Sequence, residues 1–144
     1  MIKRFHLIAG TIGFLTILTF WLSTAAAELF GSAETITNVK QAIPWGFLVL
    51  VPALVITGAS GFRMAGPTSD PRVARKKRRM RVVAGNGLLI LIPAALYLAM
   101  LASRGELGRL FYGVQAIELV AGAANLMLMA LNIQDGLRLT GRLR

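Results

Sequence analysis

Four long apolar blocks, separated by short polar segments, decide what this chain can fold into. The blocks cover residues 5–27, 43–62, 82–101 and 110–137. A helix needs about 20 apolar residues to cross the hydrocarbon core of a bilayer, because each residue rises only about 1.5 Å. Each block meets this length. The sequence therefore predicts an all-α membrane protein with four transmembrane helices in a single domain that covers residues 1–144.

The composition supports a membrane protein and excludes several kinds of site. Hydrophobic residues make up 56% of the chain, against about 45–50% in ordinary globular proteins. There is no cysteine and only one histidine, which excludes disulfides, thiolate metal sites and any site that needs two histidines from one chain. The first block also resembles a signal peptide ending at Ala25–Ala27, but it is longer than a usual signal h-region, so we expect a retained span.

Basic residues predict how the spans are oriented. Of the 16 Lys and Arg residues, 13 fall in three segments that lie on one side of a four-span chain: the N-terminus, the loop 63–81 and the C-terminal tail, which includes Arg142 and Arg144. The segments on the other side hold Lys40, Arg104 and Arg109. Because basic loops stay in the cytoplasm, we expect an antiparallel bundle with both termini and loop 63–81 inside, and Lys40 in an outer loop of residues 28–41.

The net charge of +10 follows from the same loops and does not require nucleic acid as a partner. Basic residues beside a membrane span bind anionic lipid headgroups. We expect membrane lipids at the cytoplasmic face as the partners of a cluster in the central loop: Arg72, Arg75, Lys76, Lys77, Arg78, Arg79 and Arg81.

The fourth block carries a polar stripe at helical spacing. Steps of three or four residues place its members on one helix face: Gln115, Glu118, Gly122, Asn125, Met129 and Asn132. Polar groups in hydrocarbon are costly, at about 2.5–3.5 kcal/mol for a charged acid at mid-helix, so the stripe should face the bundle interior or a partner. The stripe is a packing device that bonds to Thr16, Thr19, Asn86 or Tyr97 on other spans, a proton or cation site at Glu118, or part of a ligand-binding site.

His6 suggests a second candidate site. Gly10 and Gly13 follow it on the same helix face, and small residues beside a histidine would let a flat haem approach the helix. The iron of a haem b would then be held by His6 and by a methionine, Met80 or Met64, or by the His6 of a second copy. The alternative is an interfacial histidine beside a glycine face that packs against another helix.

The second and third blocks share a short pattern. Residues 46–53 (GFLVLVPA) and 87–94 (GLLILIPA) have the same glycine-to-proline spacing. Inverted repeats are typical of transporters, although short apolar strings also coincide by chance. Pro52 and Pro93 each remove a backbone hydrogen bond in mid-span and should bend their helices.

A set of short motifs spread over nearly the whole chain carries a resemblance: His6–Gly10, Trp21, Ala84–Gly87, Ile92–Ala94, Phe111–Tyr112, Gln115, Glu118–Gly122, Asn125, Asn132 and Asp135–Gly136. With these motifs the chain resembles a group of small, uncharacterised four-helix membrane proteins of proteobacteria. The resemblance implies a bacterial inner-membrane location and carries no activity.

Three functions compete at this stage. The first is a non-catalytic accessory, scaffold or ligand-binding module that packs through the polar stripe, as a homo-oligomer or within a membrane complex. The second is a b-type haem protein with His6 as axial ligand. The third is a small dimeric proton-coupled transporter that uses Glu118. No catalytic motif is present, so the sequence favours a protein that is not an enzyme.

Overall fold

The computed structural model describes residues 1–66 and 71–139, which fold into helices joined by short turns. Four helical rods are long and apolar enough to cross a membrane, which confirms the all-α prediction. The third rod runs without a break from Pro71 to Ser103 and contains a short π-helix. The elements are α1 (Ile2–Phe30), α2 (Ala33–Ala65), α3 (Pro71–Asn86), η1 (Gly87–Leu91), α4 (Ile92–Ser103) and α5 (Arg109–Leu139).

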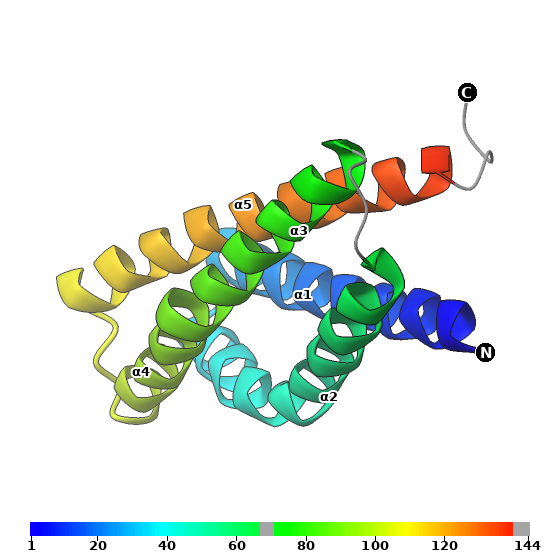
Figure 1. The fold of residues 1–144 in the computed structure, drawn as a ribbon. Coiled ribbons are helices and arrows are strands. Elements are labelled where there is room, and N and C mark those ends of the chain that lie inside the picture. Colours follow the sequence, from blue (N-terminus) through cyan, green and yellow to red (C-terminus); the bar gives the residue numbers. More distant parts are fainter. Residues whose placement is uncertain (67–70, 140–144) are drawn as a thin grey trace.

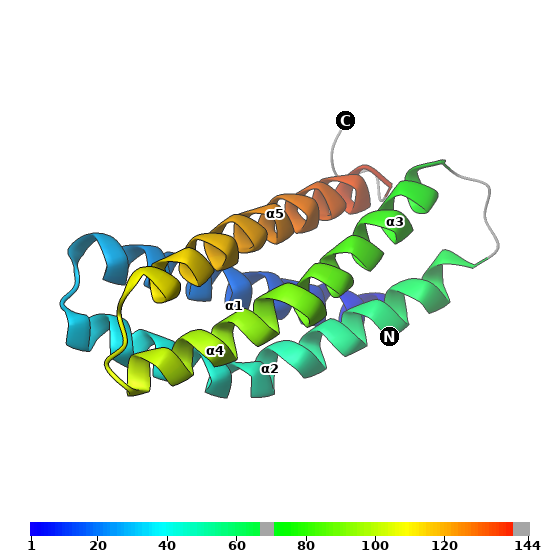
Figure 2. The same cartoon turned by 90° about the vertical axis from the view of Figure 1, so that its left-hand side faces the viewer.

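The helices form a ring in which each rod packs on two neighbours. α1 packs on α2 and α5, and α4 packs on α2 and α5, while the backbones of the diagonal pair α2 and α5 do not come close within the described chain. Figure 2 shows the N-terminus, the end of α2, the start of α3 and the end of α5 toward one end of the bundle, here called the basic end. The connections α1–α2 and α4–α5 lie at the opposite end, here called the far end.

Two predicted loops are largely helical. The expected outer loop 28–41 contains only a short break, because α2 begins at Ala33, where the Ser32 hydroxyl accepts a hydrogen bond from the Thr35 N–H. Pro44, the second residue of the predicted span 43–62, therefore lies well inside α2. In the basic loop 63–81, residues 71–81 belong to α3, since Lys and Arg are good helix formers. Residues 67–70, Arg142 and Arg144 lie outside the described chain.

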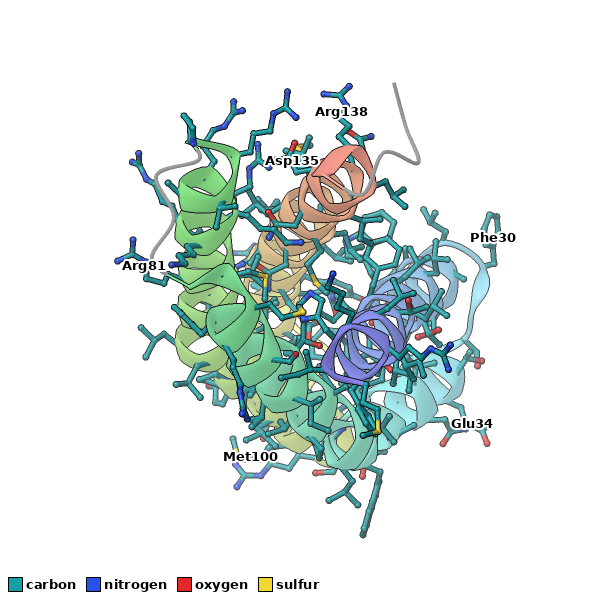
Figure 3. All side chains as sticks on the ribbon, turned by 45° about the vertical axis from the view of Figure 1, so that its right-hand side comes forward. Phe30, Glu34, Arg81, Met100, Asp135 and Arg138 are labelled. Carbon is teal, nitrogen blue, oxygen red and sulfur yellow. The ribbon has the colours of Figure 1, made fainter. Side chains whose placement is uncertain are left out.

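Apolar side chains cover both the inside and the outside of the bundle. One buried cluster lies toward the far end and includes Leu98, Leu101 and Phe111, and a second lies further along the helices and includes Leu50 and Val83. Many large apolar side chains are exposed instead, as Figure 3 shows for the sticks around the outer surface. Such a surface suits lipid tails, because hydrocarbon is as apolar as the side chains that face it.

The two mid-span prolines are accommodated differently. Figure 1 shows that α2 bends along its middle, where it contains Pro44 and Pro52. In the third rod, Pro93 follows a π-helix in which the Ile92 N–H donates to the Gly87 carbonyl. A proline has no N–H to donate to a carbonyl of the preceding turn. A wider turn is one way in which a helix accommodates this missing hydrogen bond. The predicted bend is thus seen in α2, whereas the π-helix before Pro93 was not predicted.

Glycines let α1 and α2 approach closely. A Cβ atom built on Gly13 would lie 3.2 Å from Leu54 Cδ2. A Cβ atom on Gly46 would overlap the ring of Phe20, which also packs edge-to-face against Phe47 with a 6.2 Å centroid separation. The α1–α2 interface therefore depends on the missing side chains of these glycines.

We predict that Gly46→Ala lowers the free energy of unfolding by about 1–3 kcal/mol, because its methyl group would push the Phe20 ring out of a packed position. Denaturant-induced unfolding in detergent micelles measures this change. The matched control is Gly58→Ala on the same helix, where a Cβ atom meets nothing within 4 Å. Equal stability of the two variants would contradict this view of the interface.

Candidate functional site

A buried ion pair bridges the diagonal of the helix ring. Lys40 Nζ on α2 lies 2.5 Å from Glu118 Oε2 on α5, and the side chains are 1% and 12% exposed. Lys40 also reaches Thr24 Oγ1 on α1 at 3.5 Å, and Gln115 Nε2 donates to Glu118 Oε2 at 3.1 Å. Side chains of α1, α2 and α5 thus meet at the Lys40–Glu118 pair. Lys40 balances the charge of Glu118 inside the bundle.

Lys40 is the functional residue that the sequence prediction misplaced. It was expected in an outer loop, but it faces inward from α2, between the buried side chains of Ile36 and Ile43. This spacing of apolar residues, four before and three after the lysine, is the signal in the sequence that could have placed it on an inward helix face. Glu28 on α1 interacts electrostatically with Lys40 and Glu118, and its Oε1 atom is buried without a hydrogen-bond partner in the described chain.

The polar stripe of α5 faces the bundle interior, one of the two environments expected for it, the other being a partner. Gln115, Asn125 and Asn132 are all at most 5% exposed. Asn86 Nδ2 donates to Asn125 Oδ1 at 2.8 Å and to the Ala121 carbonyl at 2.9 Å, which confirms the expected Asn86–Asn125 contact. The amide atoms of Asn132 are buried with no partner among the described residues.

The other expected partners make no hydrogen bond to the stripe within the described residues. Thr16 and Thr19 donate to the backbone carbonyls of Ile12 and Leu15, one turn earlier in α1. Tyr97 is 37% exposed. The partner of Glu118 is a lysine instead of these neutral groups, because only an opposite charge compensates a carboxylate in hydrocarbon.

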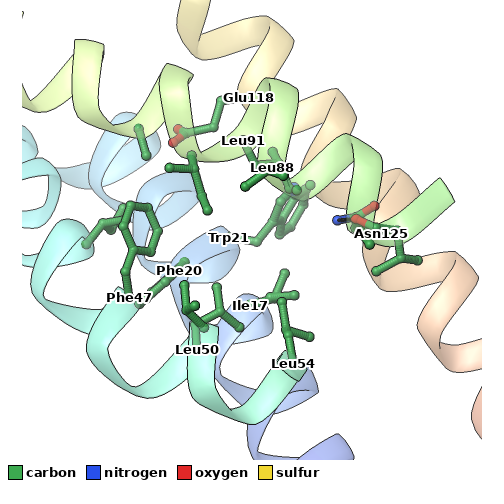
Figure 4. Close-up of a pocket in the computed structure, with 18 of the residues that line it drawn as sticks. Ile17, Phe20, Trp21, Phe47, Leu50, Leu54, Leu88, Leu91, Glu118 and Asn125 are labelled. Atoms are coloured by element: carbon green, nitrogen blue, oxygen red, sulfur yellow. Dashed lines mark hydrogen bonds between the residues drawn. The ribbon is translucent and has the colours of Figure 1, made fainter. Parts of the chain in front are cut away.

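A cavity of about 370 Å³ lies beside this polar network. All four rods contribute to its wall, and almost every lining group is apolar, including Leu50, Leu54, Leu88 and Leu91. Figure 4 shows Trp21 among these side chains, with Glu118 and Asn125 at the α5 side. The Trp21 indole N–H donates to the Leu119 carbonyl at 2.9 Å, which fixes the ring in the cavity wall.

The cavity opens sideways between α2 and the third rod. Its lining includes Val55 and Phe62 on α2 and Leu88 on η1, which are 62%, 57% and 66% exposed. Figure 2 shows α2 and α3 diverging toward the basic end. The π-helix helps to shape this wall, because it places Gly87, Leu88 and Leu91 along the cavity. Val55, Phe62 and Leu88 make the sides of this opening apolar, and the exposed side chain of Arg81 also lines the cavity.

The His6 face does not fit a haem. His6 Nδ1 lies 3.0 Å from Ser60 Oγ and 3.1 Å from the Thr57 carbonyl on α2. Gly10 faces Thr57 and Gly13 faces Leu54, so α2 fills the face where a macrocycle would have to lie. Met80, an expected second ligand, lines the cavity between the rods. Within the described chain, His6, Gly10 and Gly13 join α1 to α2, which is the packing alternative that the sequence left open.

The basic cluster divides into engaged and free residues. Arg79 Nη1 pairs with Asp135 Oδ2 at 2.7 Å, Lys77 donates to the Gly66 carbonyl, and Lys76 lies near Gly136 on α5. Arg72 also has an interaction within the described chain. The side chains of Arg75, Arg78 and Arg81 are exposed, and among them only Arg81 lines the cavity.

Comparison with known proteins gives no match to a protein-family model, to a curated protein or to a solved structure.

We predict that breaking the Lys40–Glu118 pair from either side costs more than removing it. Lys40→Met or Glu118→Leu should each lower the free energy of unfolding by about 3–5 kcal/mol, because each leaves one buried charge uncompensated. The double variant replaces both charges with apolar groups of similar size and should recover most of that loss.

Unfolding in detergent micelles measures the four members of this double-mutant cycle. The ion pair would not have the role described if the double variant were as unstable as the sum of the two single variants.

Proposed function

We propose that this chain is a non-catalytic module of the bacterial inner membrane that binds the acyl chain of a membrane lipid in the cavity between α2 and the third rod. The observation that carries the proposal is the cavity itself: about 370 Å³ of nearly apolar space with an opening framed by exposed apolar side chains. Ligand cavities in proteins have volumes of about 300–1,000 Å³. The cavity therefore has the size and polarity that an acyl chain requires.

The bilayer itself supplies the occupant in this proposal. The opening is framed by Val55, Phe62 and Leu88, and hydrocarbon chains surround any such surface in a membrane. An occupant from water would have to cross the headgroup layer first. Because one copy of the chain supplies every wall of the cavity, binding does not require the homo-oligomer or partner complex that the polar stripe left open.

The two alternative functions have less support. A proton-coupled transporter needs a carboxylate that exchanges its proton during transport, but Glu118 is held by Lys40 and Gln115. The glycines and prolines of the two similar segments also have different surroundings, since Gly46 packs on Phe20 and Gly87 faces Asn125. A b-type haem protein would need space beside His6 that α2 fills.

The proposed orientation is an antiparallel bundle with the N-terminus, the α2–α3 segment and the C-terminus in the cytoplasm. It is supported by the sequence, in which 13 of the 16 Lys and Arg residues fall in the N-terminus, the segment 63–81 and the C-terminal tail. The α1–α2 and α4–α5 connections would then face the periplasm. In this orientation Arg81 lies near the cytoplasmic headgroups and the Lys40–Glu118 pair lies nearer the periplasmic surface.

Cysteine labelling tests this orientation, since the chain contains no cysteine of its own. We predict that a membrane-impermeant maleimide labels Arg104→Cys, in the α4–α5 connection, in intact spheroplasts. It should label Arg75→Cys, on the exposed side of α3, only after the membrane is opened. The reverse pattern would contradict the orientation.

Tryptophan fluorescence tests the binding function. The chain has two tryptophans, so Trp45→Phe leaves Trp21 in the cavity wall as the only reporter. We predict that lipids with brominated acyl chains quench Trp21 in this background. Gly58→Leu should lower the quenching at least about twofold, because Gly58 lines the cavity and has open space in front of it, where a leucine side chain would compete with the lipid.

The matched control is Gly113→Leu on α5, which has the same open surroundings but does not line the cavity. Its quenching should equal that of the Trp45→Phe background. Acyl-chain binding in the cavity would be ruled out by an unquenched Trp21, or by the same quenching in Gly58→Leu and Gly113→Leu.

A further inference from the structure

The cavity has a charged group at its basic end. Phe62 on α2 and Met80 and Arg81 on α3 line this end. The Arg81 side chain is exposed and has no hydrogen bond or ion pair within residues 1–66 and 71–139. A guanidinium at the mouth of an apolar cavity is a group that an anionic ligand would neutralise.

The other charges near the cavity already have partners. At the far end, Lys40 and Glu118 neutralise each other. At the basic end, Asp135 on α5 pairs with Arg79, so this acid is not available to Arg81. Among the described residues that line the cavity, the charge still without a partner is therefore positive and lies at one end. A complementary occupant would have an apolar chain and one anionic group.

The dimensions fit a lipid held at that end. Arg81 and Ala95 both line the cavity and belong to the same helical rod. Their separation in sequence corresponds to about 21 Å along the helix axis, at about 1.5 Å per residue. One leaflet contributes about 15 Å to the hydrocarbon core. A chain whose headgroup lies beside Arg81 would thus meet cavity-lining residues of this rod over about the depth of its leaflet.

An apolar surface adjoins the mouth of the cavity on the outer side of the rod. Val82 and Leu89 are 52% and 74% exposed, and they do not line the cavity. A second acyl chain attached to the same headgroup could lie on this surface while the first occupies the cavity. A ligand with two chains would therefore cover more of the exposed apolar area than a free fatty acid.

We propose that the occupant is an anionic glycerophospholipid of the cytoplasmic leaflet, with its phosphate bound by Arg81 and one acyl chain inserted between α2 and the third rod. This inference rests on the proposed function and names its ligand class and its specificity residue. Arginine suits the role because its planar guanidinium can donate two parallel hydrogen bonds to a phosphate.

Lipid retention tests the proposal. The protein is reconstituted in nanodiscs that hold equal amounts of phosphatidylglycerol and phosphatidylethanolamine, released into detergent, and analysed by native mass spectrometry. We expect retained phosphatidylglycerol to exceed phosphatidylethanolamine by about fivefold, the contribution of one basic side chain near an anionic surface. The ethanolamine lipid carries its own ammonium and gains less from Arg81.

Two variants of Arg81 and one control locate the preference. Arg81→Gln should bring the ratio of the two lipids close to one while the total amount of retained lipid changes little. Arg81→Lys keeps the charge and should keep part of the preference. Arg75→Gln removes the same charge from an exposed position of α3 about 120° around the helix, and it should retain the full preference.

The outcomes separate this inference from the proposed function. An unchanged ratio in Arg81→Gln, or an equal loss in Arg75→Gln, would overturn the role of Arg81 and leave acyl-chain binding intact. Stronger retention of oleate than of either phospholipid would overturn the ligand class. If neither lipid is retained and Gly58→Leu behaves like wild type, the proposed function fails as well.

Discussion

The ion pair between Lys40 and Glu118 is the interaction on which the arrangement of the helices depends. The backbones of α2 and α5 lie on a diagonal of the ring and do not come close within the described chain. The long lysine side chain spans that diagonal and joins the two helices near the far end. Hydrocarbon contains no water that could solvate either charge in place of the ion pair. The pair therefore holds α2 and α5 at a fixed separation, with Thr24 of α1 as a third contact.

The cavity follows from this spacing. Toward the far end, buried apolar side chains such as Leu98 and Phe111 pack into a cluster. Toward the basic end, α2 diverges from α3 and the interior is not filled. Polar groups of the neighbouring wall bond to one another and not to a ligand: Asn86 donates to Asn125, and Trp21 donates to the Leu119 carbonyl. Polar groups that satisfy one another leave an interior surface that suits an apolar ligand.

Much of the fold was predictable because it depends on local patterns. Length and apolar composition predicted the four rods. The spacing of Gln115, Asn125 and Asn132 predicted a face of α5 turned to the bundle interior or to a partner, and their burial shows that it is the interior. The contact of Asn86 with Asn125 was also expected from the cost of an unpaired amide in hydrocarbon.

The candidate site depends on contacts between distant segments, which such patterns do not specify. Lys40 was assigned to a loop because charge was taken as a sign of exposure, whereas its partner lies 78 residues away. The cavity results from the packing angles of whole helices, and the π-helix from the local response to Pro93. From the sequence, the glycines after His6 could have faced either a haem or another helix. The position of α2, which packs on this face, decides between the two.

The central claim is that a lipid chain occupies the cavity between α2 and the third rod. The most direct measurement is photo-cross-linking with phosphatidylglycerol that carries a diazirine in the middle of one acyl chain, followed by peptide mapping. The account predicts that adducts concentrate on cavity-lining residues such as Leu50 and Leu91. Adducts spread evenly over lipid-facing residues of other helices, such as Ile117 and Val120, with none in the cavity, would contradict it.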